Sequence, residues 1–115
     1  MQVGDSVLPG AADTIVAQAT GSARSALAII RLSGPDAHRI GADVLTRWRA
    51  TPRVAYLTAL CDPLRAREID SAIVTVYAGP ASFTGEDMVE LSLHGGEVGP
   101  ALAINVLIAA GARLA

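Results

Sequence analysis

The apolar run Ala26-Leu-Ala-Ile-Ile-Arg-Leu32, followed at once by Ser33-Gly34-Pro35-Asp36, constrains the fold of this chain more than any other segment. A nearly continuous apolar run of this length is typical of a central strand that is covered on both faces. The glycine and proline end the strand, and Asp36 or Ser33 is suited to cap a helix, with proline early in its first turn. The segment therefore predicts a strand that turns sharply into a helix.

The other elements follow from hydrophobic spacing and turn residues. Apolar residues at helical spacing predict an amphipathic helix from Ala37 to about Arg47, and a second helix from Pro100 to Ala110 with Gly111 after its end. Alternating or β-branched runs predict four further strands: Thr14–Thr20, Ala55–Leu60, Ile69–Tyr77 and Met88–Leu93. The order β-β-α-β-β-β-α predicts an α+β fold, an α/β sandwich with two main helices on a mixed sheet of about five strands.

The length of 115 residues fits one domain. Residues 1–12 contain Gly4, Pro9 and Gly10 without a sustained period and predict a mobile tail, which leaves 13–115 as the folded domain. The most apolar window, 101–112, is too short to span a bilayer, since a span needs about 20 residues. It predicts a buried helix, and the absence of a charged, apolar leader favours a cytoplasmic protein.

Charge and residue types exclude several chemistries. All nine basic residues are arginine, so neither a P-loop lysine nor a lysine Schiff base is present. The net charge of −2 and pI near 5.5 do not favour a nucleic-acid domain, although Arg47, Arg49 and Arg53 form a basic cluster that suits either phosphate contacts or a solvated surface. The single cysteine, Cys61, forms no internal disulfide and lacks partners at zinc-ligand spacing.

Two residues stand out as candidate ligand contacts. Arg31 lies near the end of an apolar strand, where its guanidinium either covers the sheet surface or faces an anion or carbonyl. Strand alternation from Met88 places Glu90 on the face opposite Val89, Leu91 and Leu93. Its carboxylate there is either solvated on an edge strand or pairs with adjacent N–H donors, as on a pterin or guanine edge.

Sharper enzymatic interpretations fail. Glu86, Asp87, Glu90 and His94 suggest a metal cluster, but strand geometry separates Glu90 from His94 by about 13 Å. The His94-Gly-Gly segment has no G-x-S-x-G nucleophile elbow beside it. His38 on the first helix is expected to lie at the surface. The sequence therefore predicts no catalytic residues and no metal ligands.

Five motifs in order resemble one known family. They are Asp13-Thr-Ile-Val-Ala-Gln-Ala-Thr20, Arg31-Leu-Ser-Gly-Pro-Asp-Ala37, Ser82-Phe-Thr-Gly-Glu-Asp87 with Glu90, His94-Gly-Gly96 and Gly111-Ala-Arg-Leu-Ala115. Together they resemble the amino-terminal domain of the tRNA modification GTPases called MnmE or TrmE. The resemblance covers Asp13 to Ala115, essentially all of the expected domain.

The resemblance implies a folate-binding, dimerising module. The family's amino-terminal domain binds 5-formyltetrahydrofolate or another tetrahydrofolate near a homodimer interface, and the full enzyme acts with the flavoprotein MnmG on the wobble uridine of tRNA. Arg31 and Glu90 match folate-contacting positions. GTP, K⁺ and Mg²⁺ belong to the family's GTPase domain, which is expected to lie outside this chain together with the helical domain. On its own the chain is therefore expected to be non-catalytic.

Departures from the family pattern keep a second interpretation open. Relatives often have a Pro-Pro-Gly-Arg-Gly-Gly loop where this chain has Gly21-Ser-Ala-Arg-Ser-Ala26, which retains Arg24 but not the prolines. Glu97 replaces the proline of a His-Gly-Gly-Pro motif, and a downstream lysine segment of the family lies beyond Ala115. The alternative is a dimerisation or interaction module that has lost ligand binding.

Overall fold

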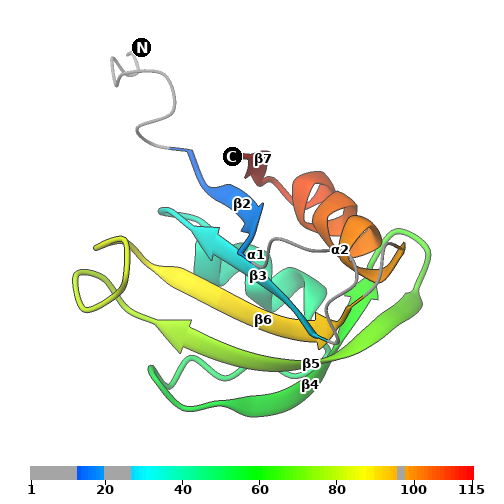
Figure 1. Cartoon of the computed structure of the whole chain (residues 1–115), viewed down its shortest axis with the longest axis horizontal. Helices are drawn as coiled ribbons and strands as arrows, with labels where there is room; N and C mark the ends of the chain where they lie inside the picture. The colour runs from blue at the N-terminus through cyan, green and yellow to red at the C-terminus, as the bar shows by residue number, and fades with distance from the viewer. Residues whose placement is uncertain (1–12, 20–26, 96–97) are drawn as a thin grey trace.

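A single mixed sheet with two helices on one face forms the fold (Figure 1). The computed structural model describes residues 13–19, 27–95 and 98–115. The strands are β2 (Ile15–Gln18), β3 (Leu27–Ser33), β4 (Tyr56–Asp62), β5 (Arg67–Tyr77), β6 (Met88–His94) and β7 (Arg113–Leu114). The helices are α1 (Ala37–Val44) and α2 (Val98–Ala109). The α+β class and the element order through α2 are as the sequence predicts.

The described sheet has six strands in the order β4-β5-β6-β3-β2-β7. Neighbours are antiparallel except for the parallel pair β2 and β7, so the sheet is mixed. The expected count of about five strands omitted β7. This strand has only two residues, and it forms because the backbone N–H of Arg113 donates to the carbonyl of Thr14 at 2.8 Å. Hydrophobic patterning gives no signal for so short an element.

The core lies between the sheet and the two helices. Alternate residues of every central strand are fully buried there, including Ile30, Leu32, Val74 and Leu91. Figure 1 shows α1 behind β3 and β6, with the opposite face of the sheet turned toward the viewer. We call this opposite face the open face.

The expectation that the run Ala26–Leu32 is covered on both faces is wrong. β3 is central in the sheet, but Ile29 and Arg31 on its open face are only half-buried, and Leu27 is exposed. The core residues Ala28, Ile30 and Leu32 alternate with them and are fully buried. A strand can therefore be apolar on both faces while only one face is covered within this chain.

The helix α1 is shorter than the sequence predicts, and the helix α2 is less buried. α1 ends at Val44, not near Arg47, because Leu45 turns extended and bridges to Leu60 of β4. Trp48 still packs on the core, against α1 at Gly41. α2 is not a fully buried helix, since Leu102 and Ile108 are exposed on its outer side. Among the helices that the structure describes, neither has the length and apolar character needed to cross a membrane.

The loop between β5 and β6 covers one end of the open face. Ser33 and Met88 lie on that face by strand alternation, yet both are buried. The Ser33 hydroxyl contacts Thr84 and Glu86 of the loop, at 2.7 and 3.0 Å. The loop, yellow-green at the left of Figure 1, thus forms a wall beside the next pair of open-face residues, Arg31 and Glu90.

Candidate functional site

Arg31 and Glu90 are paired at the centre of the open face. They are directly opposite each other in the register of β3 and β6, and the Arg31 Nε donates to Glu90 Oε2 at 2.8 Å. Their side chains are 36% and 23% exposed, so both groups remain accessible to a ligand. The alternation predicted from Met88 is confirmed, since Val89, Leu91 and Leu93 are buried on the other face.

An aromatic ring stands over the guanidinium of this pair. The Arg31 Cζ lies 5.2 Å from the centre of the Phe83 ring, which is a cation–π contact. Phe83 itself is 84% exposed. Sequence reasoning did not single out Phe83 as a contact residue. The available signal was a rare aromatic within a glycine- and proline-rich loop that leads into the strand of Glu90.

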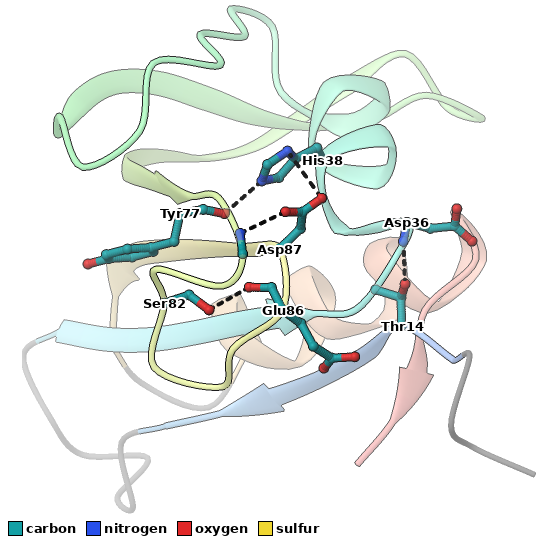
Figure 2. Close-up of polar contacts among 8 residues, drawn as sticks. Thr14, Asp36, His38, Tyr77, Ser82, Glu86 and Asp87 are labelled. Carbon is teal, nitrogen blue, oxygen red and sulfur yellow. Dashed lines mark hydrogen bonds and ion pairs between the residues drawn. The ribbon is translucent and has the colours of Figure 1, made fainter. Parts of the chain in front are cut away.

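The loop that carries Phe83 is held at both ends (Figure 2). At its start, the Gly79 N–H donates to Asp87 Oδ1 at 2.9 Å, and at its end the Gly34 N–H donates to the Asp87 carbonyl at 3.0 Å. His38 of α1 supports both sides, since its ring lies 2.9 Å from the Tyr77 carbonyl and 3.9 Å from Asp87. The sequence predicts His38 at the surface; its side chain is 29% exposed, and its ring links helix and loop.

A shallow hollow of about 150 Å³ lies on the open face on the other side of the pair. Three exposed apolar side chains, Leu27, Leu57 and Ile73, contribute to its lining. Ser92, two residues beyond Glu90, also lines it and pairs with Ile73, so the hollow begins about 7 Å from Glu90 along the strand. Along the open face, the loop between β5 and β6 is therefore followed by the Arg31–Glu90 pair and then by the apolar hollow.

Comparison with known proteins identifies the family. The family described as "GTP-binding protein TrmE N-terminus" matches residues 14–115. The chain belongs to this TrmE amino-terminal family. The tRNA modification GTPase MnmE of Nitratiruptor sp. is 42% identical over 102 residues, which are 89% of this chain and 22% of that protein.

Two further relatives show how widely this TrmE-type domain occurs. MnmE of Thermotoga maritima is 40% identical over 104 residues, or 90% of this chain and 23% of that protein. The mitochondrial tRNA modification GTPase mss1 of Schizosaccharomyces pombe is 46% identical over 83 residues, or 72% of this chain and 16% of that protein. The chain thus spans about a fifth of the length of the curated relatives that it matches.

His94 of the TrmE-type domain pairs with Asp70 and not with Glu90. Its ring Nδ1 lies 2.9 Å from Asp70 Oδ1, and its backbone N–H donates to Oδ2 at 3.0 Å. Burial acts to raise the pKa of Asp70, but hydrogen bonds from His94 and the charge of its ring outweigh burial and lower that pKa. Within 13–19, 27–95 and 98–115, no three His, Cys, Asp or Glu residues are grouped as metal ligands.

The other residues singled out in the sequence are the arginine cluster and the single cysteine, and both lie away from the Arg31–Glu90 pair. Arg47, Arg49 and Arg53 are exposed, and the Arg49 guanidinium lies 5.8 Å from the ring of Tyr56. Cys61 is half-buried, and its pKa is raised by burial and by the nearby charge of Glu68. The expected tail at 1–12, Arg24 with its loop, and Glu97 lie outside the described residues.

Proposed function

We propose that this TrmE-type domain binds a tetrahydrofolate, such as 5-formyltetrahydrofolate, on its open face through Arg31 and Glu90. The observation that carries the proposal is the ion pair between these two residues, half-exposed at the centre of a sheet face. Both side chains belong to the motifs by which the chain resembles the folate-binding family. The pair offers a ligand one anionic acceptor and one planar cationic donor.

The chemistry of the pair suits the edge of a pterin. One oxygen of Glu90 accepts from Arg31, and the carboxylate has further lone pairs for the amino group and ring N–H of a pterin. The Arg31 guanidinium donates to Glu90 through Nε only, and among the described residues its Nη atoms make no hydrogen bond. These atoms are therefore suited to a ligand carbonyl or carboxylate.

We further propose that a second copy of the chain completes the site. The hollow of about 150 Å³ beside the pair is smaller than the roughly 300–1,000 Å³ typical of sites that bury a drug-sized ligand. The exposed apolar residues Leu27, Leu57 and Ile73 are suited to burial against a partner. A homodimer that covers the open face would enclose a ligand that one protomer leaves exposed.

In the complete protein, we propose, this domain serves wobble-uridine modification of tRNA, together with an MnmG-type flavoprotein. The relatives are named tRNA modification GTPases, and this chain matches about a fifth of their length. GTP, K⁺ and Mg²⁺ would act in a separate GTPase domain, so the domain described here would bind and dimerise without catalysing a reaction. We propose the cytoplasm as its compartment.

A ligand series tests the proposal with the chain as it stands. We expect calorimetry to detect 5-formyltetrahydrofolate binding, and no binding of p-aminobenzoylglutamate, because that fragment lacks the pterin edge that Glu90 recognises. Equal binding of both compounds would contradict the assigned contact.

The rival function is a dimerisation module that has lost its ligand. It is favoured by the direct pairing of Arg31 with Glu90 at 2.8 Å, which forms without a ligand. A dimer in sedimentation that binds neither 5-formyltetrahydrofolate nor p-aminobenzoylglutamate would support this alternative over folate binding.

A further inference from the structure

Phe83 is an exposed aromatic residue in a chain with few aromatic residues. Its ring is 84% exposed, although a phenylalanine gains most by burial. It is also one of only four aromatic residues among Trp, Tyr and Phe in the chain. Trp48 and Tyr56, by contrast, pack on or within the core. Phe83 therefore lies outside the core, and what distinguishes it from other exposed apolar residues is its contact with Arg31.

The loop holds this exposed ring in a defined place. Within the loop, the Ser82 hydroxyl donates to the Glu86 carbonyl, and the Gly85 N–H donates to the Ser82 carbonyl at 3.3 Å. The residue after Phe83 is fixed to the sheet, since Thr84 Oγ1 lies 2.7 Å from the buried Ser33 hydroxyl. Figure 2 shows the first of these contacts together with the Asp87 contacts that close the loop. Phe83 is therefore presented on a pre-organised support.

The contact with Arg31 does not by itself explain the ring. A cation–π interaction at an exposed site is weak, and Arg31 is already paired with Glu90. One guanidinium contacts both groups, since the Arg31 Cζ lies 5.2 Å from the centre of the Phe83 ring and the Arg31 Nε donates to Glu90 at 2.8 Å. A planar ligand that replaces the guanidinium on this aromatic face can therefore direct its edge toward the carboxylate beside it.

We propose that Phe83 is a stacking platform for a planar heteroaromatic ring whose N–H edge is bound by Glu90. This inference rests on the proposed folate function and assigns the pterin ring of the ligand to Phe83. The loop geometry keeps the platform rigid, so stacking costs little ordering of the protein. An aromatic face accepts any flat ring, while the carboxylate selects rings with adjacent N–H donors.

The test compares three single variants with the unmodified chain by calorimetry, using 5-formyltetrahydrofolate as the probe. Phe83→Ala is expected to weaken affinity about 5- to 150-fold, the range found when an aromatic stacking partner is truncated. Phe83→Tyr keeps the aromatic face and is expected to stay within about threefold of the unmodified chain. Leu64→Ala is the matched control, because Leu64 is also 84% exposed and lies in the turn after β4.

The outcomes separate the two proposals. If the unmodified chain binds and Phe83→Ala binds equally well, or if Leu64→Ala weakens binding as much, the stacking role is overturned while folate binding stands. If the unmodified chain does not bind, folate binding itself fails, and the stacking role fails with it. Urea denaturation of each variant checks folding, and we expect unchanged midpoints because both side chains are exposed.

Discussion

Replacing Gly34 with alanine should destabilise the domain far more than the same change at Gly85. Gly34 connects β3, which carries Arg31, to α1, and its φ of +143° is one that side chains rarely adopt. A Cβ at this position would lie 2.6 Å from Thr14 Cα and 2.7 Å from the Asp13 carbonyl oxygen. These are backbone atoms, so the first residues of the sheet must move.

The magnitude follows from the contacts that such a movement breaks. The unfavourable φ costs about 1–3 kcal/mol. Displacing Thr14 also weakens two hydrogen bonds: the one that its hydroxyl accepts from the Asp36 N–H at 2.8 Å, and the one that its carbonyl accepts from the Arg113 N–H. Each of them contributes about 1 kcal/mol. A total of about 3–5 kcal/mol is a large part of the roughly 5–15 kcal/mol that stabilises a typical domain.

The assay is urea denaturation followed by the fluorescence of Trp48, the only tryptophan. Gly85→Ala is the matched control, since Gly85 also has a positive φ, +84°, but a Cβ there meets no atom within 4 Å. We expect Gly85→Ala to lose only the free energy that a positive φ costs a residue with a Cβ, about 1–2 kcal/mol. A Gly34→Ala protein no less stable than Gly85→Ala would refute the argument that close packing of β2 on this corner sets the turn.

Two further predictions concern pH and association. The Asp70 pKa is lowered in the folded state, so its contribution to stability is present above the ordinary carboxyl pKa of about 3.9 and is lost as pH falls through the lowered value. In Asp70→Asn, the free energy of unfolding measured in urea should therefore fall less steeply as the pH is lowered. The same pH dependence in the variant and the unmodified chain would contradict this. Leu57→Gln, on the open face, should leave stability within about 0.5 kcal/mol and abolish the dimer in sedimentation. Leu64→Gln should leave the dimer intact, and loss of the dimer in both variants would contradict the assigned face.

The sequence predicts those parts of the site that depend on strand alternation. Strand alternation predicts that Glu90 lies on the face opposite its core neighbours Val89 and Leu91, and the structure confirms that placement. Its pairing with Arg31 could not be predicted, because strand register depends on which strands become neighbours. The same holds for Asp70, which reaches His94 across the sheet.

What the sequence did not predict depends on tertiary packing. Trp48 continues the helical spacing of α1, but the helix ends early because Leu45 bridges to β4. Phe83 lies in an irregular loop without periodicity, and only the folded loop brings its ring over Arg31. The outer face of α2 is apolar in sequence yet exposed at Leu102 and Ile108, so composition alone could not show how far that helix is buried.

The central claim is that the Glu90 carboxylate recognises the ligand without being needed for the fold. Glu90→Gln keeps the shape of the side chain and removes its charge. The pair with Arg31 is half-exposed, so its loss should cost no more than about 1 kcal/mol of stability. Losing charge-assisted hydrogen bonds to a ligand costs about 1.5–3 kcal/mol, or roughly 10- to 150-fold in affinity.

The decisive measurement is calorimetric titration of 5-formyltetrahydrofolate into the unmodified chain, Glu90→Gln and the control Glu68→Gln, whose carboxylate is exposed on β5. We predict binding by the unmodified chain and by Glu68→Gln with equal affinity, and at least about tenfold weaker binding by Glu90→Gln at unchanged stability. Equal affinity of all three proteins, or binding by none of them, would contradict the claim.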